Sequence, residues 1–305
     1  MDRREFLKVV GGAAAAVGAA PLLAANAPAQ AAPVAAGAPG AAAPWFSISL
    51  AGWSLHRRHF SEGKLPLADF PRVAREEFGI GAIELVNTMF PSPTWRAQQE
   101  LLASAAKHDV KVLLIMCDAE GDLSAERDAD RLQAVANHRK WLEIAANLGC
   151  HSIRVNTGGR PGTPVDQQRC IDSLKRLGEM AAERSLHVLC ENHWGMSSYP
   201  DDLVAVMRGV AMSNVGTLPD FGNFPDDVDR YAAVAAMLPF AKAVSAKCHD
   251  FDAEGRETRT DYARMLGLVR AAGYRGFVGI EYEGERLSEA EGIRAAKRLL
   301  ETLST

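Results

Sequence analysis

The chain has 305 residues, a formal charge of −4 and a charged fraction of 24%. No extended run of Lys and Arg occurs outside the amino terminus, so binding to nucleic acid through counterion release is disfavoured. The five cysteines make an odd count without a Cys-x-x-Cys pair, which argues against a disulfide framework and indicates buried free thiols.

The amino terminus has the pattern of an export signal. Arg3 and Arg4 precede Phe-Leu-Lys, an Ala/Gly/Val/Leu run follows over residues 9–25, and Ala29-Gln30-Ala31 offers a small-x-small cleavage site. Residues 1–31 are therefore predicted to be a cleaved twin-arginine-type signal peptide, which implies the twin-arginine export machinery as a partner and a periplasmic or otherwise exported protein. A retained anchor is the alternative, disfavoured because the run is too short and too rich in Gly and Ala to span about 30 Å of hydrocarbon.

The remaining residues fit one large domain. Residues 32–44, rich in Ala and Pro, lack periodicity and are predicted to be a disordered linker. Residues 45–305 then have the length of a single (β/α)8 barrel, which needs about 250 residues.

In chain order, short apolar segments rich in Val, Ile and Leu alternate with longer segments of helical periodicity. Strands are predicted at 47–52, 82–86, 111–116, 152–155, 187–191, 215–220, 243–249 and 277–282. Helices are predicted at 67–78, 94–108, 125–148, 165–185, 200–209, 226–238, 260–272 and 288–303. Eight strictly alternating units predict an α/β fold with a closed parallel sheet, a TIM barrel. An open doubly wound sheet is the alternative, but it usually has a Gly-rich turn after its first strand, and none is present.

Polar clusters follow the last four predicted strands at intervals of about 30 residues, the length of one strand, one helix and two loops. They are Cys190-Glu191-Asn192-His193, Pro219-Asp220-Phe221-Gly222-Asn223, Lys247-Cys248-His249-Asp250 and Glu281-Tyr282-Glu283. A carboxylate at the end of a buried strand points either into the barrel mouth or into the apolar helix layer, where an unpaired charge costs several kcal/mol. Glu191 and Glu281 are therefore expected to face the mouth.

Acids that converge at one place repel one another unless a cation separates them. Four side chains are predicted to hold one divalent metal: Glu191, Asp220, His249 and Glu281. This mostly oxygen set suits Mn²⁺, Mg²⁺ or Co²⁺, with Zn²⁺ as an alternative. The competing interpretation is that the acids form ion pairs with nearby basic residues, namely Arg154, Lys242, Lys247 or Arg256.

The segments Glu191-Asn192-His193, Pro219-Asp220-Phe221-Gly222-Asn223, Ala246-Lys247-Cys248-His249-Asp250 and Gly279-Ile280-Glu281-Tyr282-Glu283 resemble those of the xylose isomerase-like TIM barrels, the sugar phosphate isomerase/epimerase family. The resemblance covers essentially all of residues 45–305. In that family a Glu, an Asp, a His and a Glu on strands five to eight hold one divalent metal, which implies the same four ligands here. In its ketose epimerases the two Glu also form the acid/base pair, which implies catalytic roles for Glu191 and Glu281.

The resemblance implies an isomerase or epimerase that acts on a keto sugar or sugar derivative through an enediolate. A metal that binds a carbonyl and a neighbouring hydroxyl acidifies the C–H between them, so one Glu can remove that proton and the other can return it from the opposite face. Loss of a β-substituent from a keto-glycoside would instead make the protein a lyase or hydratase, and a non-catalytic envelope sugar-binding protein is a further alternative. An abasic-site endonuclease shares this barrel, but its three-metal cluster needs more histidines than stand at these strand ends.

Two positions depart from the family pattern. Many members have a His three residues after the strand-six Asp, where this chain has Asn223, and many have their strand-seven His at the position of Ser245.

Further residues at or just past strand ends are predicted to contact the carbohydrate substrate, and each has a structural alternative as a loop, core or ion-pair residue. They are His193, Lys247, Glu84, His56, Trp53 and Asn156. Trp53 is expected to provide a stacking surface for a sugar ring. A homo-oligomer is compatible with this fold, but no interface is evident in the sequence.

Overall fold

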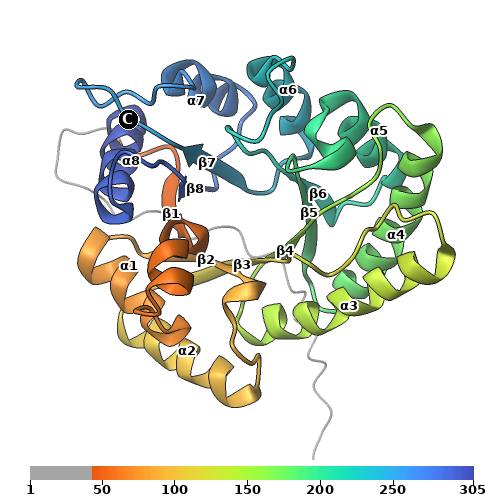
Figure 1. Cartoon of the computed structure of the whole chain (residues 1–305), viewed down its shortest axis with the longest axis horizontal. Coiled ribbons are helices and arrows are strands. Elements are labelled where there is room, and N and C mark those ends of the chain that lie inside the picture. Colours follow the sequence, from red (N-terminus) through yellow and green to blue (C-terminus); the bar gives the residue numbers. More distant parts are fainter. Residues whose placement is uncertain (1–42) are drawn as a thin grey trace, which may run out of the picture. The chain divides into compact units, whose positions relative to one another are not determined.

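The computed structural model describes residues 43–305, so the predicted signal peptide (residues 1–31) and residues 32–42 of the predicted linker lie outside the described range. Within it, strands and α-helices alternate along the chain (Figure 1). The strands are β1 Ser47–Ala51, β2 Ala82–Val86, β3 Lys111–Met116, β4 Ser152–Val155, β5 His187–Glu191, β6 Val215–Leu218, β7 Val244–Cys248 and β8 Phe277–Tyr282. The helices are α1 Phe70–Phe78, α2 Trp95–Lys107, α3 Asp128–Asn147, α4 Pro164–Ala182, α5 Pro200–Val210, α6 Arg230–Met237, α7 Tyr262–Ala271 and α8 Glu289–Leu303.

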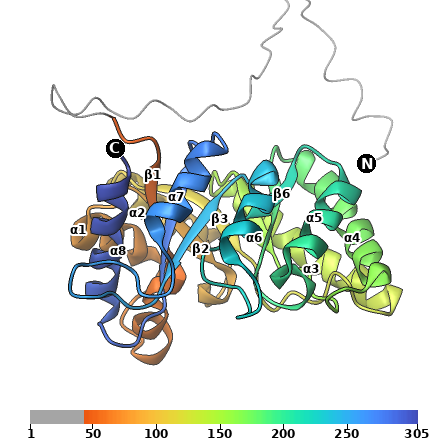
Figure 2. The same cartoon turned by 90° about the horizontal axis from the view of Figure 1, so that it is seen from above.

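The strands form one parallel sheet in the order β6-β5-β4-β3-β2-β1-β8-β7. Isolated parallel pairs close the seam between β6 and β7, Thr217 with Ala241 and Asp220 with Ser245. At this seam Ser245 N donates to Pro219 O at 2.9 Å. Figures 1 and 2 show the helices outside the curled sheet. The predicted TIM barrel is confirmed.

Most strand bounds agree with the prediction, and the exceptions have local causes. β6 ends two residues before its predicted end because Pro219 has no N–H to donate to a neighbouring strand. α6 begins at Arg230, four residues late, because the Asp229 side chain accepts from Tyr231 N and Ala232 N and caps the helix there.

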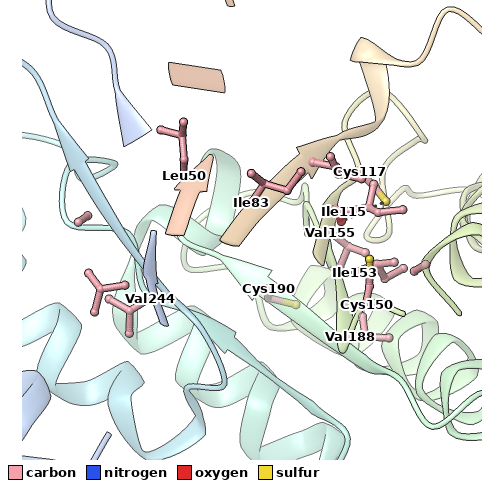
Figure 3. Close-up of a cluster of buried hydrophobic side chains, with 14 of the residues drawn as sticks. Leu50, Ile83, Ile115, Cys117, Cys150, Ile153, Val155, Val188, Cys190 and Val244 are labelled. Atoms are coloured by element: carbon pink, nitrogen blue, oxygen red, sulfur yellow. Dashed lines mark hydrogen bonds between the residues drawn. The ribbon is translucent and has the colours of Figure 1, made fainter. Parts of the chain in front are cut away.

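The two faces of the strands build two separate apolar clusters. The larger lies between the strands and the helices, and Figure 3 shows part of it, including Leu50, Ile83, Ile115, Ile153, Val188 and Cys190. The smaller lies inside the barrel and includes Met116, Leu189 and Leu218. Because side chains alternate along a strand, Glu191 shares the inner face with Leu189.

All five cysteines are buried and free, as predicted, and Cys190 and Cys248 belong to the outer cluster. No helix in residues 43–305 combines the length and the apolar character needed to cross a membrane.

Candidate active site

Three carboxylates meet at the carboxyl-terminal end of the barrel. Glu191 is the last residue of β5, Asp220 stands two residues past β6, and Glu281 lies on β8. All three are buried, and one oxygen from each lies within 4.8 Å of the others. The structure therefore brings together three of the four predicted metal ligands.

The carboxylate of Asp220 is fixed on both sides. Its Oδ1 accepts from Gly222 N and Asn223 N, both at 2.8 Å, and its Oδ2 accepts from Ser245 Oγ at 2.7 Å. Asn192 holds the backbone of the same residue: its Nδ2 donates to Asp220 O at 2.9 Å, and its Oδ1 accepts from Asp220 N at 2.8 Å. Asp220 is thus placed before any ligand arrives.

A buried ammonium group lies beside Glu281. Lys247 Nζ is 2.9 Å from Glu281 Oε1 and 3.4 Å from Glu283 Oε1, and it donates to Asn223 Oδ1 at 3.0 Å. Burial opposes the charge of Lys247, but the surrounding carboxylates, Glu281 first among them, hold its pKa well above the usual value. Lys247 therefore stays charged.

The guanidinium group of Arg154 places a positive charge beside Glu191, as Lys247 does beside Glu281. Arg154 Nη1 donates to Asp118 Oδ1 at 2.6 Å, and Arg154 Nε lies 2.8 Å from Glu191 Oε2 without hydrogen-bond geometry. Asn223 Nδ2 donates to the other oxygen, Glu191 Oε1, at 3.2 Å. Of the four basic residues considered as ion-pair partners, Arg154 and Lys247 contact acids of the site alongside the carboxylate cluster, whereas Arg256 pairs with Asp252 and Glu254.

The donor set fits a divalent cation. Glu191 Oε2 and Glu281 Oε2 are buried and receive no hydrogen bond from the described residues. Buried carboxylate oxygens nearly always have a partner, and a metal ion supplies one without a donor hydrogen. Burial raises the pKa of Glu191 to about 7 against the opposing charge of Arg154, and it raises the pKa of Asp220 to about 7. A cation would favour the ionised forms of both.

His249 does not join this group. β7 ends at Cys248, and its inward positions are occupied by Ser245 and Lys247. Beyond the strand, the carboxylate of Glu257 accepts from His249 N at 3.2 Å and from Thr260 N at 2.5 Å, which holds the following loop. The geometry thus gives no support to His249 as the fourth ligand.

Glu84 lies deeper in the barrel than the three converging carboxylates. It is buried, and its Oε1 accepts from Ser49 Oγ at 2.6 Å. A Cβ atom at Gly279 would stand 2.5 Å from Glu84 Oε1, so glycine is needed where the Glu84 carboxylate crosses β8. Burial raises the pKa of Glu84 to about 7. Because Gly279 precedes Glu281 by two residues on the same face, Glu84 lies one layer below the mouth.

A chain of hydrogen bonds fixes the proton position of His193. Asn156 Nδ2 donates to Asp118 Oδ1 at 2.9 Å, so Asn156 Oδ1 faces His193 Nδ1 at 3.1 Å as an acceptor. Nδ1 therefore carries the hydrogen, and Nε2 is left with a lone pair. Burial lowers the pKa of His193, so its ring is neutral near pH 7.

Trp53 and His56 stand together after β1. Their rings stack with centroids 5.2 Å apart, and His56 Nδ1 lies 2.8 Å from Trp53 O. Trp53 also packs against the inner apolar cluster. This position leaves Trp53 at the barrel mouth, where the sequence predicted a stacking surface.

The sequence-based list of site residues did not include Arg154, Asp118, Asn223 or Ser245. For Arg154 a signal existed, because it precedes Asn156 by two residues in a buried strand and so shares its inward face. No comparable signal predicts that Asn223 would link Lys247 to Glu191, since that contact depends on how the loop after β6 folds.

The model of the xylose isomerase-like TIM barrel family matches residues 72–303. Comparison with curated protein sequences gives no match. Similar solved structures include a D-tagatose 3-epimerase-like protein, with 16% identity over 85% of this chain and 98% of that one and a TM-score of 0.69.

Two further similar structures carry other activities in their names. The 3-keto-D-glucoside 4-epimerase of E. coli has 17% identity over 84% of this chain and 99% of its own, with a TM-score of 0.67. The probable 3-DHS dehydratase of Bacillus anthracis has 16% identity over 84% and 99%, with a TM-score of 0.65. At these identities the likeness shows the fold.

Proposed function

The chain belongs to the xylose isomerase-like TIM barrel family, and we propose that it is a metal-dependent isomerase or epimerase of a keto sugar or sugar derivative. The observation that carries the proposal is the meeting of the buried Glu191, Asp220 and Glu281. Among the described residues, Glu281 Oε2 receives no hydrogen bond, and Glu191 Oε2 has only the ion-pair contact with Arg154 Nε. The epimerases among the similar solved structures support this class of reaction.

Glu191, Asp220 and Glu281 would hold the cation. Their all-oxygen donor set suits Mn²⁺, Mg²⁺ or Co²⁺ better than Zn²⁺. When bound, the metal would polarise a substrate carbonyl and a neighbouring hydroxyl and so acidify the C–H between them. Carboxyl groups outnumber Arg154 and Lys247 in the mouth, so the site as it stands favours a further positive charge.

The protein's own groups would move the proton. Glu191 and Glu281 come from strands that are not neighbours in the sheet, so they would approach a bound sugar from different directions. One would take the C–H proton and the other would return it, which inverts the centre or, with return at another carbon, isomerises the sugar. Lys247 would donate to the substrate oxygen on which negative charge develops, and His193 Nε2 would accept from a hydroxyl.

A lyase or dehydratase reaction is the second candidate. It would share the first proton removal and then release a substituent from the adjacent carbon. The charged Lys247, held 2.9 Å from Glu281 Oε1, favours it because an ammonium group can donate a hydrogen bond to the oxygen that leaves, while the carboxyl group that took the C–H proton can supply that oxygen with its proton. A dehydratase also stands among the similar solved structures.

The test is solvent exchange in D₂O. The Mn²⁺-loaded protein is incubated with a panel of ketoses and keto-glycosides, and NMR and mass spectrometry follow deuterium incorporation and any loss of mass. Exchange at one carbon supports the isomerase or epimerase, whereas a product that lacks the substituent identifies the lyase.

Glu191→Gln and Glu281→Gln should each lose the exchange. Glu285→Gln, in the exposed loop after β8, is the matched control and should retain it. Absence of exchange on every member of the panel, with the metal bound, would reject the proposal.

We also propose that the protein is exported by the twin-arginine route, on the basis of the pattern in residues 1–31. Because that route carries folded proteins, the metal would be acquired before export.

A further inference from the structure

Beside the acidic site lies a hollow that the proton-transfer chemistry does not use. It has a volume of about 520 Å³, and its lining residues belong mainly to the loops that follow β5 and β6, with Pro161 from the loop that follows β4. Its walls include Pro161, Trp194, Tyr199 and Phe224. Aromatic and proline side chains on several sides of one hollow are typical of a site for a ring-shaped ligand.

Two residues belong both to this hollow and to the surroundings of the catalytic carboxylates. Asn223 lines the hollow, and its Nδ2 donates to Glu191 Oε1 while its Oδ1 accepts from Lys247 Nζ. His193 also lines it and is hydrogen-bonded to Asn156. The hollow therefore borders the carboxylate site, and Asn223 and His193 lie at the junction of the two.

The loop that carries Trp194 is held in place. A Cβ atom at Gly195, whose φ is +69°, would stand 2.7 Å from Gly158 O, so this glycine lets the loop pack directly on the loop after β4. Met196 N donates to Gly158 O at 3.2 Å, and Ser197 Oγ donates to Trp194 O at 3.0 Å. Trp194 is nonetheless 46% exposed. The exposed indole of Trp194 is thus carried by a loop whose backbone is held in place.

The hollow is uncharged. Among the described residues that line it there is no Asp, Glu, Lys or Arg. A phosphate group would find no cation among them. The hollow does reach Tyr199, the N-cap of α5, but Pro200 has no N–H to donate, and the acidic Asp201 and Asp202 of the first turn disfavour an anion. The occupant that fits is a neutral ring.

We propose that this hollow is the subsite for a neutral ring substituent, a second sugar or an aryl group, so that the substrate is a keto-glycoside and not a free ketose or a sugar phosphate. The inference rests on the proposed function, because it assumes that the keto-sugar ring is held at the carboxylates. Trp194 would stack against the substituent, while His193 and Asn223 would bind hydroxyls at the junction.

The experiment compares three probes by isothermal titration calorimetry on the Mn²⁺-loaded protein: 3-keto-glucose, phenyl 3-keto-glucoside in both anomers, and glucose 6-phosphate. One anomer of the phenyl glycoside should bind at least about tenfold more tightly than the free keto sugar, the magnitude expected for one aromatic stacking contact. Equal affinity for the two, or tighter binding of the phosphate, would overturn the proposal.

Substitutions of single tryptophans test whether Trp194 causes the difference in affinity between the two probes. Trp194→Ala should weaken binding of the phenyl glycoside about tenfold and change binding of the free keto sugar less than about twofold, while Trp194→Phe should restore most of the loss. Trp95→Ala removes another exposed indole, 64% exposed at the start of α2, and should change neither. An equal loss for both probes in Trp194→Ala, or no loss, would contradict the subsite.

The D₂O exchange assay separates this inference from the proposed function. If the glycoside binds in a way that depends on Trp194 but no sugar shows exchange, the subsite is supported and the isomerase is rejected. Exchange on free ketoses that is equally fast in Trp194→Ala, together with no preference for the phenyl glycoside, would keep the isomerase and reject the subsite.

Discussion

Replacing Lys247 by Met would remove a buried ammonium group from the centre of the acidic site. The side chain is 3% exposed, and its Nζ contacts Glu281 Oε1, Glu283 Oε1 and Asn223 Oδ1. Removing one partner of a buried ion pair costs about 3–5 kcal/mol, because the other charge is left without compensation. For a domain of this size that corresponds to a fall in Tm of about 6–20 °C.

The assay is thermal unfolding of the metal-free and the Mn²⁺-loaded protein, followed by circular dichroism. A cation bound by the same carboxylates should recover part of the loss, so Mn²⁺ should raise the Tm of Lys247→Met more than it raises that of the wild type. Lys175→Met, which removes an exposed lysine of α4, should leave Tm unchanged. A metal-free Lys247→Met protein that melts within about 2 °C of the wild type would refute the reasoning, since the expected cost is about 3–5 kcal/mol.

Two further predictions concern pH and export. Burial raises the pKa of Glu84, Glu191 and Asp220 to about 7 from 4.5 for Glu and 3.8 for Asp, so the folded metal-free protein holds protons that the unfolded chain releases. The contribution of these three groups to stability should be complete below about pH 4 and lost as the pH rises through about 7. In melting curves from pH 4 to 8, the fall in Tm should be smaller for Glu84→Gln, and for the wild type with Mn²⁺, than for the metal-free wild type. An equal fall in Tm in all three samples would contradict this. Changing Arg3 and Arg4 together to Lys should retain the precursor in the cytoplasm, which fractionation and immunoblotting would detect, and unchanged export would count against a twin-arginine signal.

The barrel could be predicted because its signals are local. Apolar segments of four to six residues, such as those that end at Glu191 and Tyr282, are long enough to form the buried strands of a parallel sheet. Alternation along each strand then decides which side chains face inward. The same alternation correctly predicted that Cys190 and Glu191 lie on opposite faces of their strand.

Positions past the end of a strand are harder to predict, because alternation no longer decides which side chains face inward. His249 stands one residue beyond β7, and the backbone there is held by Glu257, eight residues later in the chain. A contact of that kind depends on the conformation of a loop, which the spacing of residues does not determine. The role of Asn223 depends in the same way on a loop that meets two strands only in the folded protein, whereas Arg154 lies on the inward face of a strand and could be expected to pair with the acids.

The central claim is that one divalent cation binds between the three buried carboxylates. It is tested most directly by anomalous diffraction from crystals of the Mn²⁺-loaded protein. We predict a single manganese peak within about 2.0–2.6 Å of one oxygen each from Glu191, Asp220 and Glu281. A peak at His249, or no peak between the three carboxylates, would contradict it.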